Sequence, residues 1–390
     1  MPDPNFSYSE DILQWIWEEQ FFDLRRLKTS EGSEIQILDP GTLNKTDGPD
    51  FLNARIRIDG MLWVGAVELH LQAKGWEQHG HNHDEKYNQV VLHVVADNNP
   101  ASVRRKDGGK IPTLNLLPFL NENLHHIIEN IIGSNGLPCS SGVTFISEDA
   151  FQAQIEKANH EYLEKKTNDF LRFYNPYMVP SRAWKEALVL SLFDGFGITH
   201  NRVPMVKLGK WFLKQEVAEY SEESLIQMAL QFAGFGTKKS DLKWNHKGVF
   251  PANHPKMRIP QVVRLAIRVL QTPTELFFDV PALTLWEKWE NSAALSGSAK
   301  MKMLYGIVFV PAMFSLGSLF GVHAIKHKAV EEWKNLRTVV PSQFTKPFIS
   351  QQHISPETYS HKLGVVHQVR AYCEPRRCHQ CIVLKKVISS

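Results

Sequence analysis

The sequence predicts an α/β (α+β) domain over residues 1–142, a mainly α-helical region over 143–370 and a cysteine-rich tail over 371–390. Three observations support this division. Apolar and polar residues alternate in the first part, as in strands, whereas apolar residues recur at helical spacing in the second. Pro and Gly separate the helical stretches. Three of the four cysteines lie within nine residues near the C-terminus.

The N-terminal part begins with a helix, predicted over residues 6–27 because apolar residues recur there at helical spacing. A strand follows in "EIQILDPG", which alternates and ends in a Pro-Gly turn. The stretches "ARIRIDG" and "MLWVGAVELHL" then predict a β-hairpin whose turn is Asp59-Gly60.

The next stretch completes this domain. "HGHNHDEKYN" predicts a brief helix. "QVVLHVVAD" is a nearly continuous apolar run, which predicts a central strand buried on both faces, and "IPTLNLL" predicts one more strand. The order helix, three strands, short helix and strand describes an α/β sandwich.

The helical region contains amphipathic stretches such as "SRAWKEALVLSLFDGF" and "PQVVRLAIRVLQ". One apolar run, "MLYGIVFVPAMFSLGSLFGV", is long enough to span a bilayer. Pro311 within it and the lack of a second such run favour a buried pair of helices; a single membrane segment is the alternative.

Composition narrows the function classes. Hydrophobic residues make up 43% and charged residues 22% of the 390 residues, as in ordinary soluble proteins. The formal net charge of +3 is too small a bias to argue for a nucleic-acid partner by itself. No signal peptide is predicted at the start, so a cytoplasmic location is expected, with no membrane partner. Four cysteines in such a chain favour a metal site over a disulfide framework.

Acidic and imidazole side chains mark the predicted hairpin. Asp50 follows Gly48-Pro49 at the start of a strand, and Glu68 and His70 lie two residues apart on the next strand, so both point to one face. Carboxylates suit Mg²⁺ or Mn²⁺, and imidazole also suits Mn²⁺ or Zn²⁺. The pattern predicts that Asp50 and Glu68 hold Mg²⁺ or Mn²⁺ while His70 binds metal or positions water. The alternative is the solvated face of a half-covered hairpin.

A second polar cluster follows within "KGWEQHGHNHDEKYN". Its three alternating histidines predict a metal-binding loop. A more modest expectation is that His81 or Asp84 faces the same cleft as Glu68, and the alternative is a polar loop. His93, within "VVLHVV", is interpreted as a core histidine with satisfied hydrogen bonds. The secondary site candidates in the cluster are His79, His81, Asp84 and Tyr87.

The order of elements, together with Pro49-Asp50 and Glu68-x-His70, resembles the core of PD-(D/E)xK nucleases. This resemblance implies a restriction-endonuclease-like fold, phosphodiester hydrolysis and a metal held by Asp50 and Glu68. His70 stands where that superfamily carries Lys. Lys74 lies on the same face if the strand continues, and could replace the missing cation.

The C-terminal segment "YCEPRRCHQC" contains Cys373, Cys378 and Cys381 with the spacing C-x4-C-x2-C. Three thiolates this close predict a soft metal site, with Cys139 as the fourth ligand. Zn²⁺ and an iron–sulfur cluster both take four thiolates, so both stay open. One nuclease family of the same superfamily has a similar layout of one early and three late cysteines, which implies a [4Fe–4S] cluster. The alternative is three free thiols near a flexible terminus.

Several motifs spread along the chain belong together: "GPDFLNARIRIDG", "W-x-G-x-VE-x-H", "GW-x-x-H-x-H-x-x-D-x-x-Y-x-x-V-x-LHVV", "FPANHPKMRIPQ" and the cysteine-rich tail. With these motifs the whole chain resembles an uncharacterised bacterial family, found mainly in the Bacteroidetes group and catalogued as a domain of unknown function. The resemblance implies a bacterial, cytoplasmic protein with two parts.

Three functions follow as expectations. The first is a metal-dependent nuclease or nuclease-like nucleic-acid-binding protein. Its phosphate contacts would come from "RVPMVKLGKWFLK", "KKSDLKWNHK" and "HPKMRIPQVVRLAIR", although such basic residues also form ordinary solvated faces. The second is a catalytically inactive scaffold or interaction protein. The third is a Zn²⁺-dependent hydrolase of a non-nucleic substrate, which uses the second polar cluster.

Overall fold

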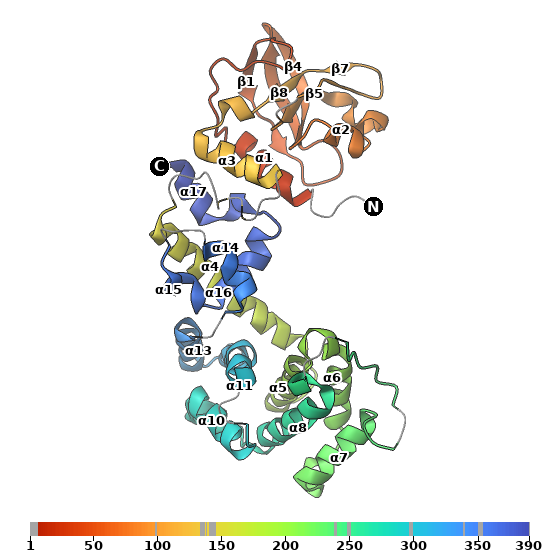
Figure 1. Cartoon of the computed structure of the whole chain (residues 1–390), viewed down its shortest axis with the longest axis vertical. Coiled ribbons are helices and arrows are strands. Elements are labelled where there is room, and N and C mark those ends of the chain that lie inside the picture. Colours follow the sequence, from red (N-terminus) through yellow and green to blue (C-terminus); the bar gives the residue numbers. More distant parts are fainter. Residues whose placement is uncertain are drawn as a thin grey trace. The chain divides into compact units, whose positions relative to one another are not determined.

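The computed structural model of the chain forms two compact units (Figure 1). Unit 1 comprises Met1–Ala158, Val340–Ser360 and Gly364–Ser390, and unit 2 comprises Asn159–Val339 and His361–Leu363. The residues that the structure describes are 7–97, 100–132, 137, 139, 146–237, 240–247, 251–295, 299–337, 340–349 and 354–389.

These units divide the chain differently from the boundaries expected from the sequence. The C-terminal tail belongs to the same unit as the N-terminal sheet instead of standing apart. The first boundary lies after Ala158, within the long helix α4 (Glu148–Leu171). This helix therefore starts in one unit and continues into the other.

A mixed sheet forms the centre of the N-terminal part of unit 1. Its strand order is β1-β3-β4-β5-β8, and β2 pairs with β3 beside this path. The first three strands of the path are antiparallel, whereas β4, β5 and β8 run parallel to one another. The strands are β1 (Ile35–Asp39), β2 (Thr42–Leu43), β3 (Phe51–Ile58), β4 (Met61–His70), β5 (Val90–Val95) and β8 (Thr113–Asn115), and a separate pair is β6 (Val103–Arg104) with β7 (Lys110–Ile111).

The β3–β4 hairpin follows the predicted pattern. Ile56 and Ile58 are buried, whereas Arg57 between them is exposed, because side chains alternate along a strand. Asp59 and Gly60 have φ values of 46° and 83°, as a tight hairpin turn requires. The predicted hairpin and its turn are therefore confirmed.

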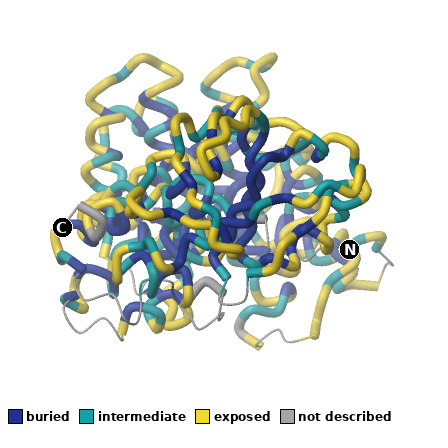
Figure 2. Tube along the Cα trace, turned by 90° about the horizontal axis from the view of Figure 1, so that it is seen from above, coloured by how far each residue is buried: buried dark blue, intermediate teal, exposed yellow. Residues whose placement is uncertain are grey.

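Two apolar clusters lie on the sheet, and β4 contributes to both. Val67 and Leu69 belong to the larger cluster, which also includes Ile12 of α1 (Ser7–Glu18). Ala66 belongs to the smaller cluster, together with Trp76. Since side chains alternate, Glu68 and His70 share the face of Ala66. Figure 2 shows such buried residues in dark blue and the exposed outer turns in yellow.

The first helix is shorter than predicted. Helix α1 ends at Glu18, and Gln20 has a φ of 54°, a left-handed conformation that closes a helix C-terminus. Phe22 still packs against the core, since its ring stacks on Trp17 at 5.9 Å. The apolar spacing predicted the packing correctly but not the end of the helix.

The region after the sheet domain is mainly helical, as predicted, and its helices alternate with short connections. Unit 2 contains α5 (Pro180–Phe196), α6 (Ile198–Phe212), α7 (Glu222–Phe232), α8 (Pro255–Gln271), α9 (Leu276–Asp279), α10 (Ala282–Ser292), α11 (Ala299–Leu304), α12 (Val310–Leu319) and α13 (His323–Asn335). Unit 1 adds α2 (Gly75–Gln78), α3 (Glu122–Ile132), α14 (Ser342–Ile349), α15 (Pro356–Ser360), α16 (Gly364–His367) and α17 (Ile382–Ser389).

The apolar run of unit 2 forms one helical stretch. Among the described residues, Ala299–Leu319 is long and apolar enough to cross a membrane, and 67% of its apolar window is buried inside the protein. Helices α11 and α12 are joined by a π-helical segment, η6 (Tyr305–Phe309), just before Pro311. The run is thus one continuous stretch where the sequence predicted a pair of helices.

Candidate metal centre

Three histidines come together at the end of β4. One ring nitrogen from each of His70, His79 and His81 lies within 4.8 Å of the other two. His70 is the last residue of β4, His79 follows α2, and His81 opens the 3-10 turn η1 (His81–His83). Three ligand atoms at this spacing could hold a metal ion.

Glu68 adds a carboxylate oxygen to this group. Its Oε1 lies 3.0 Å from Nε2 of His81 and 3.7 Å from Nε2 of His70. Glu68 is only 4% exposed. Nε2 of His81 is buried and makes no hydrogen bond of good geometry with the described residues. A buried nitrogen of this kind, beside a carboxylate, fits a ligand to a cation.

Local backbone geometry explains how these side chains meet. Glu68 and His70 share a face because they lie two apart on β4. Gly75 lies against His70, and a Cβ there would come within 2.6 Å of His70 Cδ2. Gly80 has a φ of 75°, which turns the chain between His79 and His81.

A fourth histidine orients the first. Nε2 of His93 lies 2.9 Å from Nδ1 of His70, and both rings are fully buried. This contact fixes the His70 ring and leaves its Nε2 directed toward His79 Nδ1, at 3.2 Å. Metal-ligating histidines commonly use their second nitrogen in this way. His93 is buried, as the sequence predicted, and its Nε2 contacts His70. The expectation that its hydrogen bonds are satisfied is wrong for Nδ1, which is buried and makes no hydrogen bond with the described residues.

Aromatic rings form one wall of the centre. The ring of His81 stacks on Tyr87 with centroids 3.8 Å apart, and Trp76 meets His81 edge-on at 5.4 Å. Trp76 also lies edge-on to His93 at 5.5 Å. Tyr87, a predicted secondary candidate, therefore lies beside the centre and holds one of its imidazoles.

Asp50 links the two strands of the hairpin beneath Glu68. Its backbone N–H donates to Glu68 Oε2 at 3.0 Å, and its Oδ2 accepts from the Leu69 N–H at 2.8 Å. Its Oδ1 accepts from Gln14 Nε2 of α1, also at 2.8 Å. Both carboxylate oxygens of Asp50 thus accept hydrogen bonds, whereas Glu68 Oε1 faces the histidines.

Three carboxyl groups are crowded here. Burial, together with the charges of Asp50 and Glu68, raises the pKa of Glu10 to about 8. Burial and the charge of Glu68 raise the pKa of Asp50 to about 8, and burial raises that of Glu68 to about 8. In the described part of the chain, no Lys or Arg forms an ion pair with any of them. A bound cation would offset this unpaired negative charge.

The imidazoles are held neutral. Burial lowers the pKa of His81 to about 4 and of His93 to about 3, and it lowers the pKa of His70 well below its usual range. The pKa of His79 is lowered for the same reason. A neutral imidazole has a free lone pair, so these rings are in the form that binds a metal.

The family model described as "Protein of unknown function (DUF2851)" matches residues 10–241. The chain belongs to the DUF2851 family. This confirms the predicted membership of a domain-of-unknown-function family. The match includes the whole histidine group as well as Cys139, and it ends before the three C-terminal cysteines. Comparisons with curated proteins and with solved structures gave no match.

The remaining candidates of this DUF2851 chain lie outside the centre. β4 ends at His70, so Lys74 does not continue the strand; it is exposed at the start of α2. The condition under which Lys74 would share the face of Glu68 is therefore not met. Asp84 caps the 3-10 turn η2 (Glu85–Gln89), where its Oδ1 accepts from the Lys86 N–H at 3.0 Å.

Sequence reasoning missed two polar residues of α1. Glu10 and Gln14 lie four apart, so both project from one side of the helix toward Asp50. A polar pair at helical spacing beside Leu13 and Trp17, which are buried, is the signal that would have identified them.

The donor set of this DUF2851 protein determines which metals it suits. Three imidazole nitrogens with one carboxylate oxygen fit Zn²⁺ or Mn²⁺ better than Mg²⁺, which prefers oxygen ligands. His79 is exposed, whereas His70 and His81 are buried, so the centre is open to solvent on the side of His79. Such an arrangement allows a substrate to approach the ion.

Proposed function

We propose that this protein is a metal-dependent phosphodiesterase of the nuclease class, with a divalent cation held by Glu68, His70, His79 and His81. The observation that carries the proposal is the convergence of three neutral imidazoles at an edge open to solvent, two of which lie within 3.7 Å of Glu68 Oε1. A cation bound there would lower the pKa of a water ligand and stabilise charge on a phosphate oxygen.

Each residue at the proposed metal centre has a distinct role. Glu68 and the three histidines bind the ion. His93 holds His70 in the ligating orientation through the 2.9 Å contact between their rings. Asp50 and Glu10 add negative charge close to the ion, which strengthens its binding.

The order of elements supports a nuclease over other hydrolases. Helix α1, the antiparallel strands β1, β3 and β4, the turns after β4 and the parallel strand β5 follow one another as in the PD-(D/E)xK layout. Asp50 precedes β3 and Glu68-x-His70 ends β4, as the acidic residues do in that layout. The departure is the imidazole of His70 in the position of Lys, which favours Mn²⁺ or Zn²⁺ as the ion.

A basic row in unit 2 supports a phosphate-rich partner. Lys207, Lys210 and Lys214 recur at helical spacing along α6 and beyond it, and all three are exposed. Two other basic residues of the predicted stretches, Arg264 and Arg268, already contact Glu222. Among the predicted basic stretches, we assign the lysine row to nucleic acid.

The test is cleavage of single- and double-stranded DNA and RNA with Mn²⁺, Zn²⁺ or Mg²⁺. We expect Mn²⁺- or Zn²⁺-dependent cleavage that falls at least about 100-fold in Glu68→Gln and in His81→Ala. Glu77→Gln and His83→Ala are matched controls, because both side chains are exposed on the same segment. Cleavage that persists in Glu68→Gln would contradict the proposed centre.

The imidazole-rich donor set favours a second candidate, a Zn²⁺ hydrolase of a non-nucleic substrate. The same variants would then lose hydrolysis of an activated ester such as p-nitrophenyl acetate, with no cleavage of any nucleic acid. Metal binding without hydrolysis of either substrate class would instead favour an inactive scaffold.

A further inference from the structure

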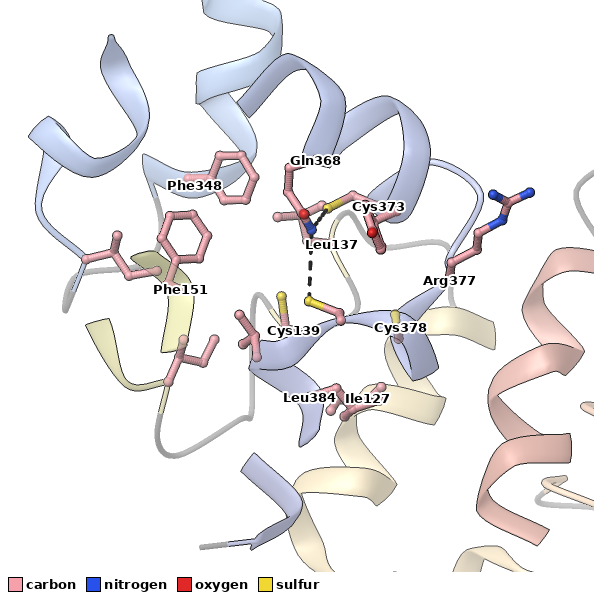
Figure 3. Close-up of a pocket in the computed structure, with 15 residues that line it drawn as sticks. Ile127, Leu137, Cys139, Phe151, Phe348, Gln368, Cys373, Arg377, Cys378 and Leu384 are labelled. Carbon is pink, nitrogen blue, oxygen red and sulfur yellow. Dashed lines mark hydrogen bonds between the residues drawn. The ribbon is translucent and has the colours of Figure 1, made fainter. Parts of the chain in front are cut away.

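A cavity in unit 1, away from the histidines, brings all four cysteines together. Cys139 follows the sheet domain, whereas Cys373, Cys378 and Cys381 lie more than two hundred residues later in the sequence. All four line the same cavity, and these described cysteines are not joined by disulfide bonds. Figure 3 shows Cys139 at this cavity together with Cys373 and Cys378 of the C-terminal segment.

The surroundings of the four thiols disfavour their charged form. Burial raises the pKa of every one of the four, and that of Cys139 to about 12. The neighbouring thiols add to this effect: Cys381 raises the pKa of Cys139, and both raise the pKa of Cys373 and of Cys378. Four soft donors that face one buried space form a ligand set for a thiophilic metal group.

A buried amide points at two of the sulfurs. Nε2 of Gln368 lies 3.4 Å from Cys373 Sγ and 4.0 Å from Cys381 Sγ, as the dashed lines of Figure 3 show. Its Oε1 accepts from Gln154 Nε2 at 2.7 Å, and Gln154 Oε1 accepts from the Ile382 N–H at 2.9 Å. Because this chain fixes the amide, its N–H groups face the thiols, and N–H donors to sulfur are typical around metal thiolates.

The spacing of the sulfurs distinguishes between the two metal groups that the sequence left open. A single Zn²⁺ with Zn–S bonds of about 2.3 Å would draw its four sulfurs to within about 4 Å of one another. Among the described residues, no three cysteine sulfurs lie within 4.8 Å of one another. A cluster spreads its thiolates more widely, because each one binds a different iron.

We propose that Cys139, Cys373, Cys378 and Cys381 ligate a [4Fe–4S] cluster in this cavity. Each cysteine gives up its thiol proton to solvent when it binds an iron. The Gln368 amide donates to two of the ligating sulfurs. The cluster ties the C-terminal segment to the segment around Cys139 by bonds that the polypeptide alone does not supply.

The cluster would also stabilise the position of helix α1. Cys378 packs against the apolar cluster that contains Ile12 and Leu13 of α1. Asp11 of the same helix lies close enough to Arg377 and His379 for their charges to interact. Because Glu10 lies on this helix, a firmly held cysteine loop keeps it beside the metal centre.

The test is anaerobic purification of the full chain, followed by reconstitution with equal amounts of ferrous and ferric iron and with sulfide. We expect iron and acid-labile sulfide in about a 4:4 ratio per chain, with a broad visible absorption that dithionite bleaches. Cys139→Ser and Cys381→Ser should each reduce the iron content at least about tenfold. Tyr372→Phe, which alters the cavity wall without removing a thiol, should retain the cluster.

Two results would overturn the proposal. One is zinc at about one ion per chain in the wild-type protein, with no iron bound after reconstitution. The other is an iron content that is the same in Cys139→Ser as in the wild type. The wild-type measurement needs no variant, so poor folding of a cysteine variant does not leave the question open. A variant that loses the cluster but retains Mn²⁺- or Zn²⁺-dependent cleavage would contradict only one statement, that the cluster stabilises the position of α1 beside the metal centre.

Discussion

At the scale of single residues, the centre is defined by carboxyl groups that form no ion pair with Lys or Arg among the described residues. The side chains of Glu10, Asp50 and Glu68 have pKa values raised to about 8. Such groups are protonated in the folded metal-free protein at pH values where they ionise in the unfolded chain. The folded state therefore binds more protons, and its stability falls as pH rises from about 4.5 to about 8.

Glu10→Gln tests this crowding. The pKa of Glu10 moves from an ordinary value of 4.5 to about 8, so ionisation at pH 8 costs the folded protein free energy. We expect the metal-free variant to be more stable than the wild type at pH 8, by more than about 1 kcal/mol. The gain should disappear at about pH 4, where the carboxyl is protonated in both states. Chemical denaturation of both proteins at pH 4 and pH 8 measures this difference in the free energy of unfolding.

Glu18→Gln is the matched control, because Glu18 lies on the same helix and is exposed. We expect its effect on the free energy of unfolding to stay within about 0.5 kcal/mol at either pH. An equal gain for both variants would show that general helix electrostatics, and not the crowded centre, causes the change.

At the scale of elements, the turn after β4 sets the geometry of the centre. The strand ends at His70, and α2 returns against it so closely that residue 75 has no room for a side chain. Lys74, the adjacent residue, is exposed. Residue 74 thus has room for a long side chain, whereas residue 75 has no room even for a Cβ. The sequence "AKGW" does not by itself reveal this difference.

Gly75→Ala should weaken metal binding. Its Cβ would lie 2.6 Å from His70 Cδ2, so the His70 ring must shift away from its ligating position. We expect Mn²⁺ or Zn²⁺ affinity to fall about 10- to 100-fold, measured by calorimetric titration. Lys74→Ala should bind the ion as the wild type does. A loss of affinity in Lys74→Ala would instead restore the role that the sequence suggested for this lysine.

At the scale of the whole molecule, the proposed metal would join the end of β4 to the turns that follow it in unit 1. The ligands come from β4 and from the turns after α2, and α1 covers them with Glu10 and Gln14. A ligand that binds only the folded state stabilises it by about 2.7 kcal/mol at one hundred times its dissociation constant. Metal content should therefore govern the thermal stability of the protein.

Removal of the metal with EDTA should lower the midpoint of thermal unfolding by at least about 4 °C, and added Mn²⁺ or Zn²⁺ should restore it. Differential scanning fluorimetry measures the shift. The double variant His79→Ala, His81→Ala should show no response to either treatment, whereas His83→Ala should respond as the wild type does. A shift that persists in the double variant would mean that the ion binds elsewhere.

Much of the fold followed from local patterns. The alternation in β3, the Asp59-Gly60 turn and the apolar run of β5 are short-range features, and each appeared where the sequence predicted it. The end of α1 was missed because the left-handed Gln20 carries no Gly signal. The unit boundary within α4 was missed because an amphipathic helix has the same pattern in either unit.

The sequence by itself determined that Glu68 and His70 share one face, since that follows from the two-residue period of a strand. Only the tertiary structure brought His81 to within 3.0 Å of Glu68 and His93 to within 2.9 Å of His70. It also separated Lys74 from the centre. The reason is that the parallel pairing of β4 with β5 and the turn after β4 depend on long-range packing, which residue spacing does not encode.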